Sequence, residues 1–291
     1  MPRKLTATQK HQLMTKLLAS AGGRQKIASS VNQPLRVLQD YQSIARRAFM
    51  VDELPDGALP IYDMDPDVPG YVVSEEANSI QTTIKSKRLL VPLFELASNP
   101  MISFTQIKER RFDAVKRIKE KARVEIFRRE DRTLFSLMNR AAAKNTVDGT
   151  NATINVTAAQ FKIDVLADAF ANIESRGLSV DKIFMNPSEF KVIRKAGRDY
   201  LDFETQRELL RTGLQGVLWG AQVLLSMEVP KGSVFLVAEP EYFGVMPVRI
   251  PLTVLPSDVP AKRQIGWSIF QSIGAGIHNA ANGLQKVNIA G

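Results

Sequence analysis

A long amphipathic helix is the clearest feature of the hydrophobic and polar pattern along the chain. It is expected to begin at Ser103 or Thr105, either of which can cap a helix, and to reach about Ala143. Apolar residues recur there at intervals of three, four or eight positions, as on one helix face. They are Ile107, Val115, Ile118, Ala122, Ile126, Leu134, Leu137 and Ala141. The other faces are dense in charge, so the helix should lie along a domain rather than through it. A coiled coil is the competing interpretation, although the stripe keeps no steady heptad.

Beyond this helix, the pattern switches between the helical period and the strand period. The expected elements are a loop with a small hairpin over 144–157, helices over 158–176 and 187–196, a strand over 180–185, a loop or helix over 200–211, and strands over 222–227, 233–238, 242–255 and 264–278. Helices and one strand followed by several consecutive strands indicate an α+β fold.

The part of the chain before the long helix is less regular. Short helices are expected near 6–18 and over 35–49, on either side of Gly22-Gly23. Residues 52–70 are rich in Pro, Asp and Gly, which is typical of turns. Strand-like runs lie at 59–62, 71–73, 79–85 and 88–96. Together they predict a long two-stranded excursion, and an isolated ribbon of this kind is marginally stable in water. The excursion therefore needs a surface to lie on, which favours an oligomer.

The charge is unevenly distributed along the chain. The formal net charge is +9, but residues 1–39 contain seven bases and no acid, residues 40–104 contain ten acids and five bases, and residues 105–140 contain twelve bases and six acids. In one interpretation these are solvated faces without a partner. In the other, the acidic segment meets the basic helix of a neighbouring copy, and the basic N-terminal segment meets nucleic acid or a scaffold.

Residues that carry enzyme chemistry are scarce. The chain has no Cys and only two His, His11 and His278, so no metal site, cofactor or histidine-based catalytic triad is expected. Nucleotide-binding, metalloprotease and nucleophile-elbow motifs are absent from the sequence. The adjacent acids Glu75-Glu76 and Glu130-Asp131 are expected to be solvated surface charges. No signal peptide or membrane-spanning stretch is expected. Together these observations predict a protein that is not an enzyme.

Several phrases of the sequence resemble the major capsid proteins of tailed bacteriophages, the Hong-Kong-ninety-seven-type fold. They are Ile183-Phe184-Met185-Asn186-Pro187-Ser188 with Phe190, Gly216 with Gly220-Ala221-Gln222-Val223, Val229-Pro230-Lys231-Gly232-Ser233, and the runs 252–258 and 264–277. Each phrase has low specificity, but their order matches the family over nearly the whole chain.

The resemblance implies a capsid fold with four parts. These are an N-terminal arm (1–50), an extended β-hairpin called the E-loop (51–98), a peripheral domain with a long spine helix (99–157 and 253–291), and an axial domain (158–252). It also implies contacts between the E-loop acids of one copy and spine-helix bases of the next. The expected contact residues are Asp63, Asp65, Asp67, Glu75, Glu76, Arg117, Lys121 and Arg128. The residues expected to face DNA or scaffold are Arg3, Lys4, Lys10, Lys16, Arg24 and Lys26.

As a capsid protein, the chain would assemble with itself into hexamers and pentamers around double-stranded DNA. Its other expected partners are a portal, decoration proteins and, because only about 50 residues precede the excursion, a separate scaffolding protein. Assembly would take place in the host cytoplasm, without a membrane, and the product would be the virion. The alternatives are an encapsulin-type nanocompartment shell, a basic nucleic-acid-binding protein that uses the charged helix, and an enzyme with a deep polar pocket.

Overall fold

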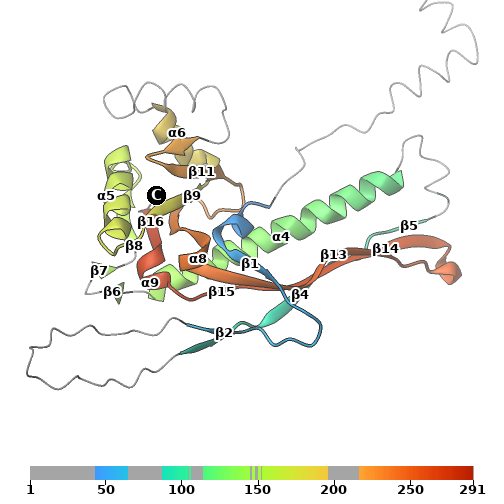
Figure 1. Cartoon of the computed structure of the whole chain (residues 1–291). Helices are drawn as coiled ribbons and strands as arrows, with labels where there is room; N and C mark the ends of the chain where they lie inside the picture. Colours follow the sequence, from blue (N-terminus) through green and yellow to red (C-terminus); the bar gives the residue numbers. More distant parts are fainter. Residues whose placement is uncertain are drawn as a thin grey trace, which may run out of the picture. The chain divides into compact units, whose positions relative to one another are not determined.

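The computed structural model describes residues 43–64, 87–103, 105, 114–144, 146–147, 150–151, 153–195 and 216–290. The chain forms two compact units. The smaller contains 98–124 and 254–269 together with 1–41, and the larger contains 42–97, 125–253 and 270–291. Three long elements, α4 (Ala114–Lys144), β13 (Gly244–Pro256) and β14 (Gln264–Gly274), contribute residues to both units (Figure 1).

A six-stranded mixed sheet organises the larger unit, with the strand order β10-β11-β9-β12-β16-β8. The strands are β8 (Thr153–Thr157), β9 (Val180–Met185), β10 (Val217–Leu218), β11 (Ala221–Leu225), β12 (Ser233–Ala238) and β16 (Leu284–Ala290). β9 runs parallel to β11 and antiparallel to β12, while β16 runs antiparallel to β12 and parallel to β8. The sheet thus joins β9, β10, β11 and β12, from the predicted axial range, with β8 and β16, from the predicted peripheral ranges. The division into these domains stays a prediction.

Both faces of this sheet are covered, because its strands alternate apolar side chains to either side. Helices α5 (Ile163–Glu174) and α6 (Pro187–Lys195) share one hydrophobic cluster with residues such as Ile183, Met185 and Leu236. The opposite cluster contains residues of α4, with Phe135 edge-on to Phe184 at 5.6 Å and stacked on Phe235 at 6.2 Å between ring centroids. Burial on both sides explains why every residue of β12 is buried.

A second sheet has the order β1-β13-β14-β4, with β15 beside β13 and β5 beside β14. The added strands are β1 (Met50–Glu53), β4 (Leu93–Ser98), β5 (Met101–Ser103) and β15 (Gly276–Ile277). In the larger unit, β1 pairs in parallel with the start of β13. In the smaller unit, β5 pairs with Gln264–Gly266 of β14, and the Lys119 ammonium lies 4.6 Å from the ring centroid of Trp267. That contact is a cation–π interaction.

Short elements complete the described chain. They are the 3₁₀ helices η1 (Ala45–Ala48) and η2 (Pro260–Lys262), the ribbon β2 (Ile61–Asp63) with β3 (Arg88–Leu90), the hairpin β6 (Thr146–Val147) with β7 (Thr150–Asn151), and the one-turn helices α8 (Pro240–Phe243) and α9 (Ala280–Gly283). Across the ranges given above, no helix is long and apolar enough to cross a membrane.

Many predicted elements are confirmed. The strands predicted at 180–185 and 233–238 have these bounds, the hairpin within 144–157 is present, and the helix predicted at 187–196 is α6. The predictions at 71–73, 79–85 and 200–211, and the start of the long helix between 106 and 113, lie outside the described residues.

Two predictions of secondary structure are wrong in detail, and one strand was missed. The described end of the helix predicted at 35–49 is only one 3₁₀ turn, because Met50–Glu53 pair with β13 instead. The helix predicted from 158 begins at Ile163, because the Gln160 side chain accepts hydrogen bonds from Thr157 and closes a turn. Strand β16 was not predicted. Gln285 and Lys286 interrupt its apolar pattern, although Gln285 is fully buried.

Candidate functional site

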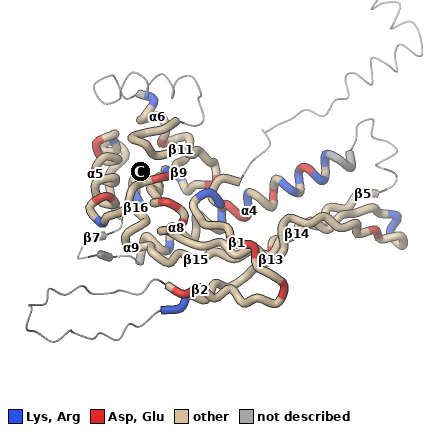
Figure 2. The backbone as a smooth tube through the Cα atoms, viewed as in Figure 1, with Lys and Arg blue, Asp and Glu red and all other residues tan. Residues whose placement is uncertain are grey.

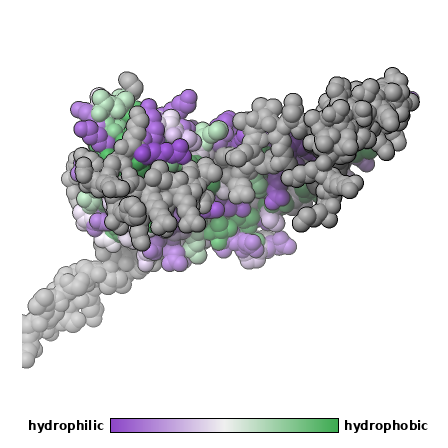
Figure 3. Space-filling view, turned by 90° about the horizontal axis from the view of Figure 1, so that it is seen from above, coloured by the Kyte–Doolittle hydropathy of each residue, from purple (hydrophilic) through white to green (hydrophobic). Residues whose placement is uncertain are grey.

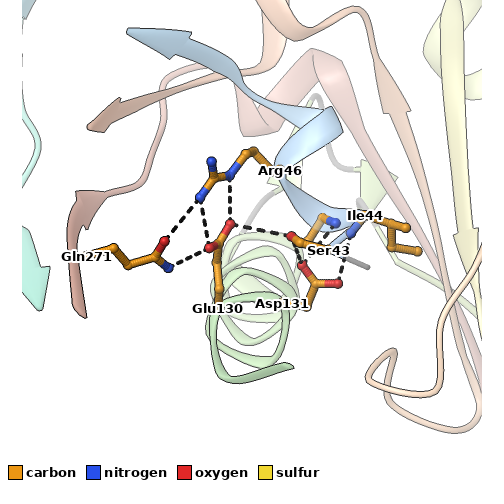
Figure 4. Close-up of polar contacts among 7 residues, drawn as sticks. Ser43, Ile44, Arg46, Glu130, Asp131 and Gln271 are labelled. Carbon is orange, nitrogen blue, oxygen red and sulfur yellow. Dashed lines mark hydrogen bonds and ion pairs between the residues drawn. The ribbon is translucent and has the colours of Figure 1, made fainter. Parts of the chain in front are cut away.

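Two buried carboxylates on α4, Glu130 and Asp131, bind the segment 43–46 of the larger unit (Figure 4). Glu130 forms a two-pronged ion pair with Arg46, with Nε–Oε1 and Nη2–Oε2 distances of 2.9 Å. The side-chain amide of Gln271, on β14, donates to Glu130 Oε2 at 2.6 Å. Glu130 is fully buried and thus binds two segments that are distant from it in the sequence, one at Arg46 and one at Gln271.

The neighbouring carboxylate, Asp131, caps the start of η1. It accepts hydrogen bonds from Ser43 Oγ at 2.6 Å, from Ile44 N at 3.0 Å and from Ala45 N at 3.2 Å. These amides have no partner within the helix they begin, so a carboxylate at this point satisfies them and offsets the positive end of the turn. We refer to Ser43, Arg46, Glu130, Asp131 and Gln271 as the carboxylate junction.

The prediction that Glu130-Asp131 are solvated charges is wrong, since both side chains are fully buried. A signal was present in the sequence. Glu130 lies four residues after Ile126 and four before Leu134, so it interrupts the apolar stripe of the long helix rather than its charged faces. A carboxylate on a buried stripe requires a cationic partner, but the sequence alone does not show which of the 39 Lys and Arg residues provides it.

The β2–β3 ribbon exposes an apolar face. Ile61 and Leu90 are directly opposite one another in the ribbon's register, and their exposed fractions are 46% and 64%. Leu59, just before β2, is exposed as well. Side chains opposite one another point to the same face, so these residues present contiguous apolar surface to solvent. Figure 3 shows apolar surface of the described residues in green beside purple polar surface.

The base of the ribbon is firmly attached to the larger unit. Val91, which follows β3, is fully buried, and a Cβ added at Gly276 would lie 2.6 Å from Val91 Cγ2. Tyr62 Oη donates to Asp52 Oδ2 at 2.6 Å and so joins β2 to β1. Burial and the adjacent Asp52 carboxylate raise the pKa of Tyr62 above its usual range, so its hydroxyl remains a donor at neutral pH. The end of the ribbon next to β1 is therefore held in place, while its apolar face is exposed.

The structure places one of the predicted contact acids. Asp63 is exposed and forms an ion pair with Arg88 across the ribbon, at 2.8 Å from Nε to Oδ1. Asp65, Asp67, Glu75 and Glu76 lie outside the described residues, as do the predicted DNA- or scaffold-facing residues. Those are Arg3, Lys4, Lys10, Lys16, Arg24 and Lys26.

The predicted contact bases lie on α4, along which basic and acidic positions alternate (Figure 2). Arg117 pairs with Glu120 at 3.0 Å in the smaller unit, and Arg128 pairs with Glu125 at 3.1 Å in the larger one. Lys121 is half-buried. Partly exposed pairs within one helix contribute only about 0.3–0.5 kcal/mol each.

Sites for chemistry are not evident in the described part of the chain. Within it, no three His, Asp or Glu side chains come together as metal ligands would. Burial lowers the pKa of Lys286, which lies on β16. The described residues form a buried carboxylate junction, which suits anchoring of one chain segment to another, and an exposed apolar face, which suits association with another molecule.

Two buried glutamines provide a matched test of the junction. Gln271 donates to Glu130, whereas the Gln285 amide has no hydrogen-bond partner among the described residues. Gln271→Met is expected to lower the free energy of unfolding by about 1–3 kcal/mol, and Gln285→Met to raise it by a similar amount, because a buried unpaired amide is destabilising. Urea unfolding of the unassembled chain measures both. If both variants changed the free energy of unfolding equally and in the same direction, this account of the junction would be wrong.

Comparison with solved structures gives matches over most of the chain. The capsid of the cyanophage P-SCSP1u has a TM-score of 0.70 at 11% identity, covering 89% of this chain and 91% of that one. The mature capsid of bacteriophage PhiM1 has a TM-score of 0.65 at 11% identity, covering 88% and 90%. The capsid of the native GTA particle has a TM-score of 0.63 at 16% identity, covering 89% and 95%.

This chain has the phage capsid fold. The prediction of an α+β capsid fold is confirmed, and the chain spans nearly the full length of the capsid chains to which it is similar. No protein-family model and no curated protein matches it. At 11–16% identity the likeness resides in the fold, so the contact residues must be argued from this chain's own side chains.

Proposed function

We propose that this chain is the major capsid protein of a tailed phage and assembles into an icosahedral shell around double-stranded DNA. The capsid fold over the whole length carries the proposal, because about nine tenths of this chain and of each capsid chain superpose. The solved structures that this chain resembles include the capsid of the native GTA particle, which was computed with C5 symmetry.

The exposed apolar face of the β2–β3 ribbon supports association with further copies. A two-stranded ribbon is marginally stable alone, and large apolar side chains gain free energy when they are covered. The proposal assigns 51–98 to an E-loop that lies on a neighbouring copy, α4 to a spine helix, and 158–252 to an axial domain. The copies would form hexamers and pentamers, with a portal, a scaffolding protein, decoration proteins and the DNA as further partners in the virion.

The charge-pairing proposal assigns Asp63, Asp65, Asp67, Glu75 and Glu76 of one copy to Arg117, Lys121 and Arg128 of the next. Reversing the three bases to Glu is expected to impede assembly at low salt, because each contact then becomes repulsive. Sedimentation across a salt series measures this effect, and Arg47→Glu, an exposed base of η1, is the control. Normal assembly of the triple variant would refute the pairing.

The proposed function is tested by expressing the chain with and without its neighbouring genes and imaging the product by negative-stain electron microscopy. Closed shells that protect double-stranded DNA from nuclease support a phage head. Small shells filled with protein cargo would point to a nanocompartment instead. A monomer or dimer that binds DNA and never assembles, even with a scaffold, would contradict the proposal.

A further inference from the structure

A tryptophan occupies an unfavourable backbone position at one end of β11. Trp219 and Gly220 form the two-residue turn between β10 and β11, with φ values of 49° and 88°. Gly, Asn and Asp suit such turns, and a bulky residue there is an outlier. Trp219 is nevertheless 46% exposed, and its ring contacts Phe170 of α5 edge-on at 5.2 Å between centroids. A strained and half-exposed aromatic residue gains little within its own chain, which is typical of a functional contact.

Trp219 adjoins an exposed apolar residue and packs against an acidic helix, which the bases Lys162 and Arg176 flank. Val217, on the adjoining edge strand β10, is exposed. Helix α5 contains three exposed acids, Asp164, Asp168 and Glu174, and no base. Figure 2 shows red acidic segments along α5, together with blue basic segments near its ends. We refer to Val217, Trp219 and the exposed face of α5 as the acidic patch.

At the other end of β11, the exposed residues include an apolar residue and a base. Met227, just after the strand, is 71% exposed, and Lys231, four residues later, is an exposed base. Between them, Glu228 forms an ion pair with Arg132 at 2.8 Å. This turn is attached to the start of α6, because Asn186 Nδ2 donates to Val229 O at 3.0 Å and Glu189 Oε1 accepts from Gly232 N at 2.9 Å. Helix α6 adds exposed Lys191 and Arg194. We refer to Met227, Lys231 and the exposed face of α6 as the basic patch.

We infer that the acidic patch of one copy binds the basic patch of the next. Each patch has an apolar centre flanked by charge, and the two charges are opposite. Their apolar centres, Trp219 and Met227, lie in the turns at opposite ends of β11. Two different patches on one chain make a head-to-tail contact, which closes into a ring when the rotation allows it. This inference rests on the proposed function and assigns it a specific contact.

The absence of native cysteine allows a direct crosslinking test. Val217→Cys and Lys231→Cys introduce one thiol beside each patch and retain Trp219 and Met227. In assembled particles treated with a short bismaleimide, the double variant is expected to give a ladder of covalent oligomers that ends at the closed ring, while each single variant gives none. Monomer alone from assembled double-variant particles would overturn the inference, as would dimers from a single variant, which indicate a two-fold contact.

Trp219→Asn separates a contact role from a folding role. Asn suits the left-handed backbone but cannot fill an apolar pocket, so the melting temperature of the unassembled chain is expected to change by less than about 4 °C. The concentration needed for assembly is expected to rise about tenfold or more. Tyr242→Asn, at an exposed aromatic residue of α8, is the control and should assemble normally. Normal assembly of Trp219→Asn would overturn the inference, whereas a wild-type chain that never assembles would refute the proposed function itself.

Discussion

Arg46→Met is expected to lower the free energy of unfolding by about 3–5 kcal/mol, because it leaves the Glu130 carboxylate buried without its cationic partner. Glu130 is fully buried, and within the described residues its remaining hydrogen bonds come from neutral donors, the Gln271 amide at 2.6 Å and the Ser43 hydroxyl at 3.4 Å. Their partial charges cannot replace two charge-assisted hydrogen bonds from a guanidinium. Urea unfolding followed by tryptophan fluorescence measures the loss.

The neighbouring arginine provides the control for this prediction. Arg47 is exposed on the same 3₁₀ turn, so Arg47→Met should change the free energy of unfolding by less than about 0.5 kcal/mol. The double variant Arg46→Met with Glu130→Met should recover much of the loss, because it removes both charges from the junction. Similar losses for Arg46→Met and Arg47→Met would contradict the role of the junction.

Replacing Ile61 and Leu90 together by Thr is expected to weaken shell assembly while leaving the subunit folded. Both side chains are exposed on one face of the β2–β3 ribbon, so the unassembled chain loses little stability, and Thr keeps a strand preference. In a shell, covering each side chain contributes on the order of 1 kcal/mol, repeated in every copy. The concentration needed for assembly should therefore rise by at least about tenfold.

Light scattering against protein concentration measures this change, together with circular dichroism of the unassembled chain. Val254→Thr is the matched control, since Val254 is an exposed apolar residue of strand β13, outside both the ribbon and the proposed E-loop. It should assemble as the wild type does. Undiminished assembly of the ribbon variant would show that this apolar face is not a contact surface.

Local patterns in the sequence predicted much of the larger unit. The strand at Val180–Met185 and the strand at Ser233–Ala238 have strong apolar runs bounded by turn residues, and both formed with the predicted bounds. Pro187 marks the start of α6 because proline is tolerated in the first turn of a helix. The order of these elements was sufficient to identify the resemblance to capsid proteins, although each phrase alone was weakly specific.

Long-range contacts account for what the sequence did not show. Strand β16 contains Gln285 and Lys286 among its apolar residues, and it forms because β12 and β8 provide backbone partners on both sides. Glu130 is buried because Arg46, 84 residues away, and Gln271, 141 residues away, converge on it. Trp219 has an unremarkable sequence context, and only its backbone angle and its exposure mark it as a candidate contact.

Local patterns therefore predict most of the elements and their order, because hydrophobic periodicity and turn residues act over a few positions. Tertiary contacts establish which charges are buried and which apolar side chains remain exposed. Both properties depend on the neighbours that the folded chain brings to a residue. The carboxylate junction and the two patches at the ends of β11 are of this kind, since each combines residues from segments whose proximity is created by the sheet.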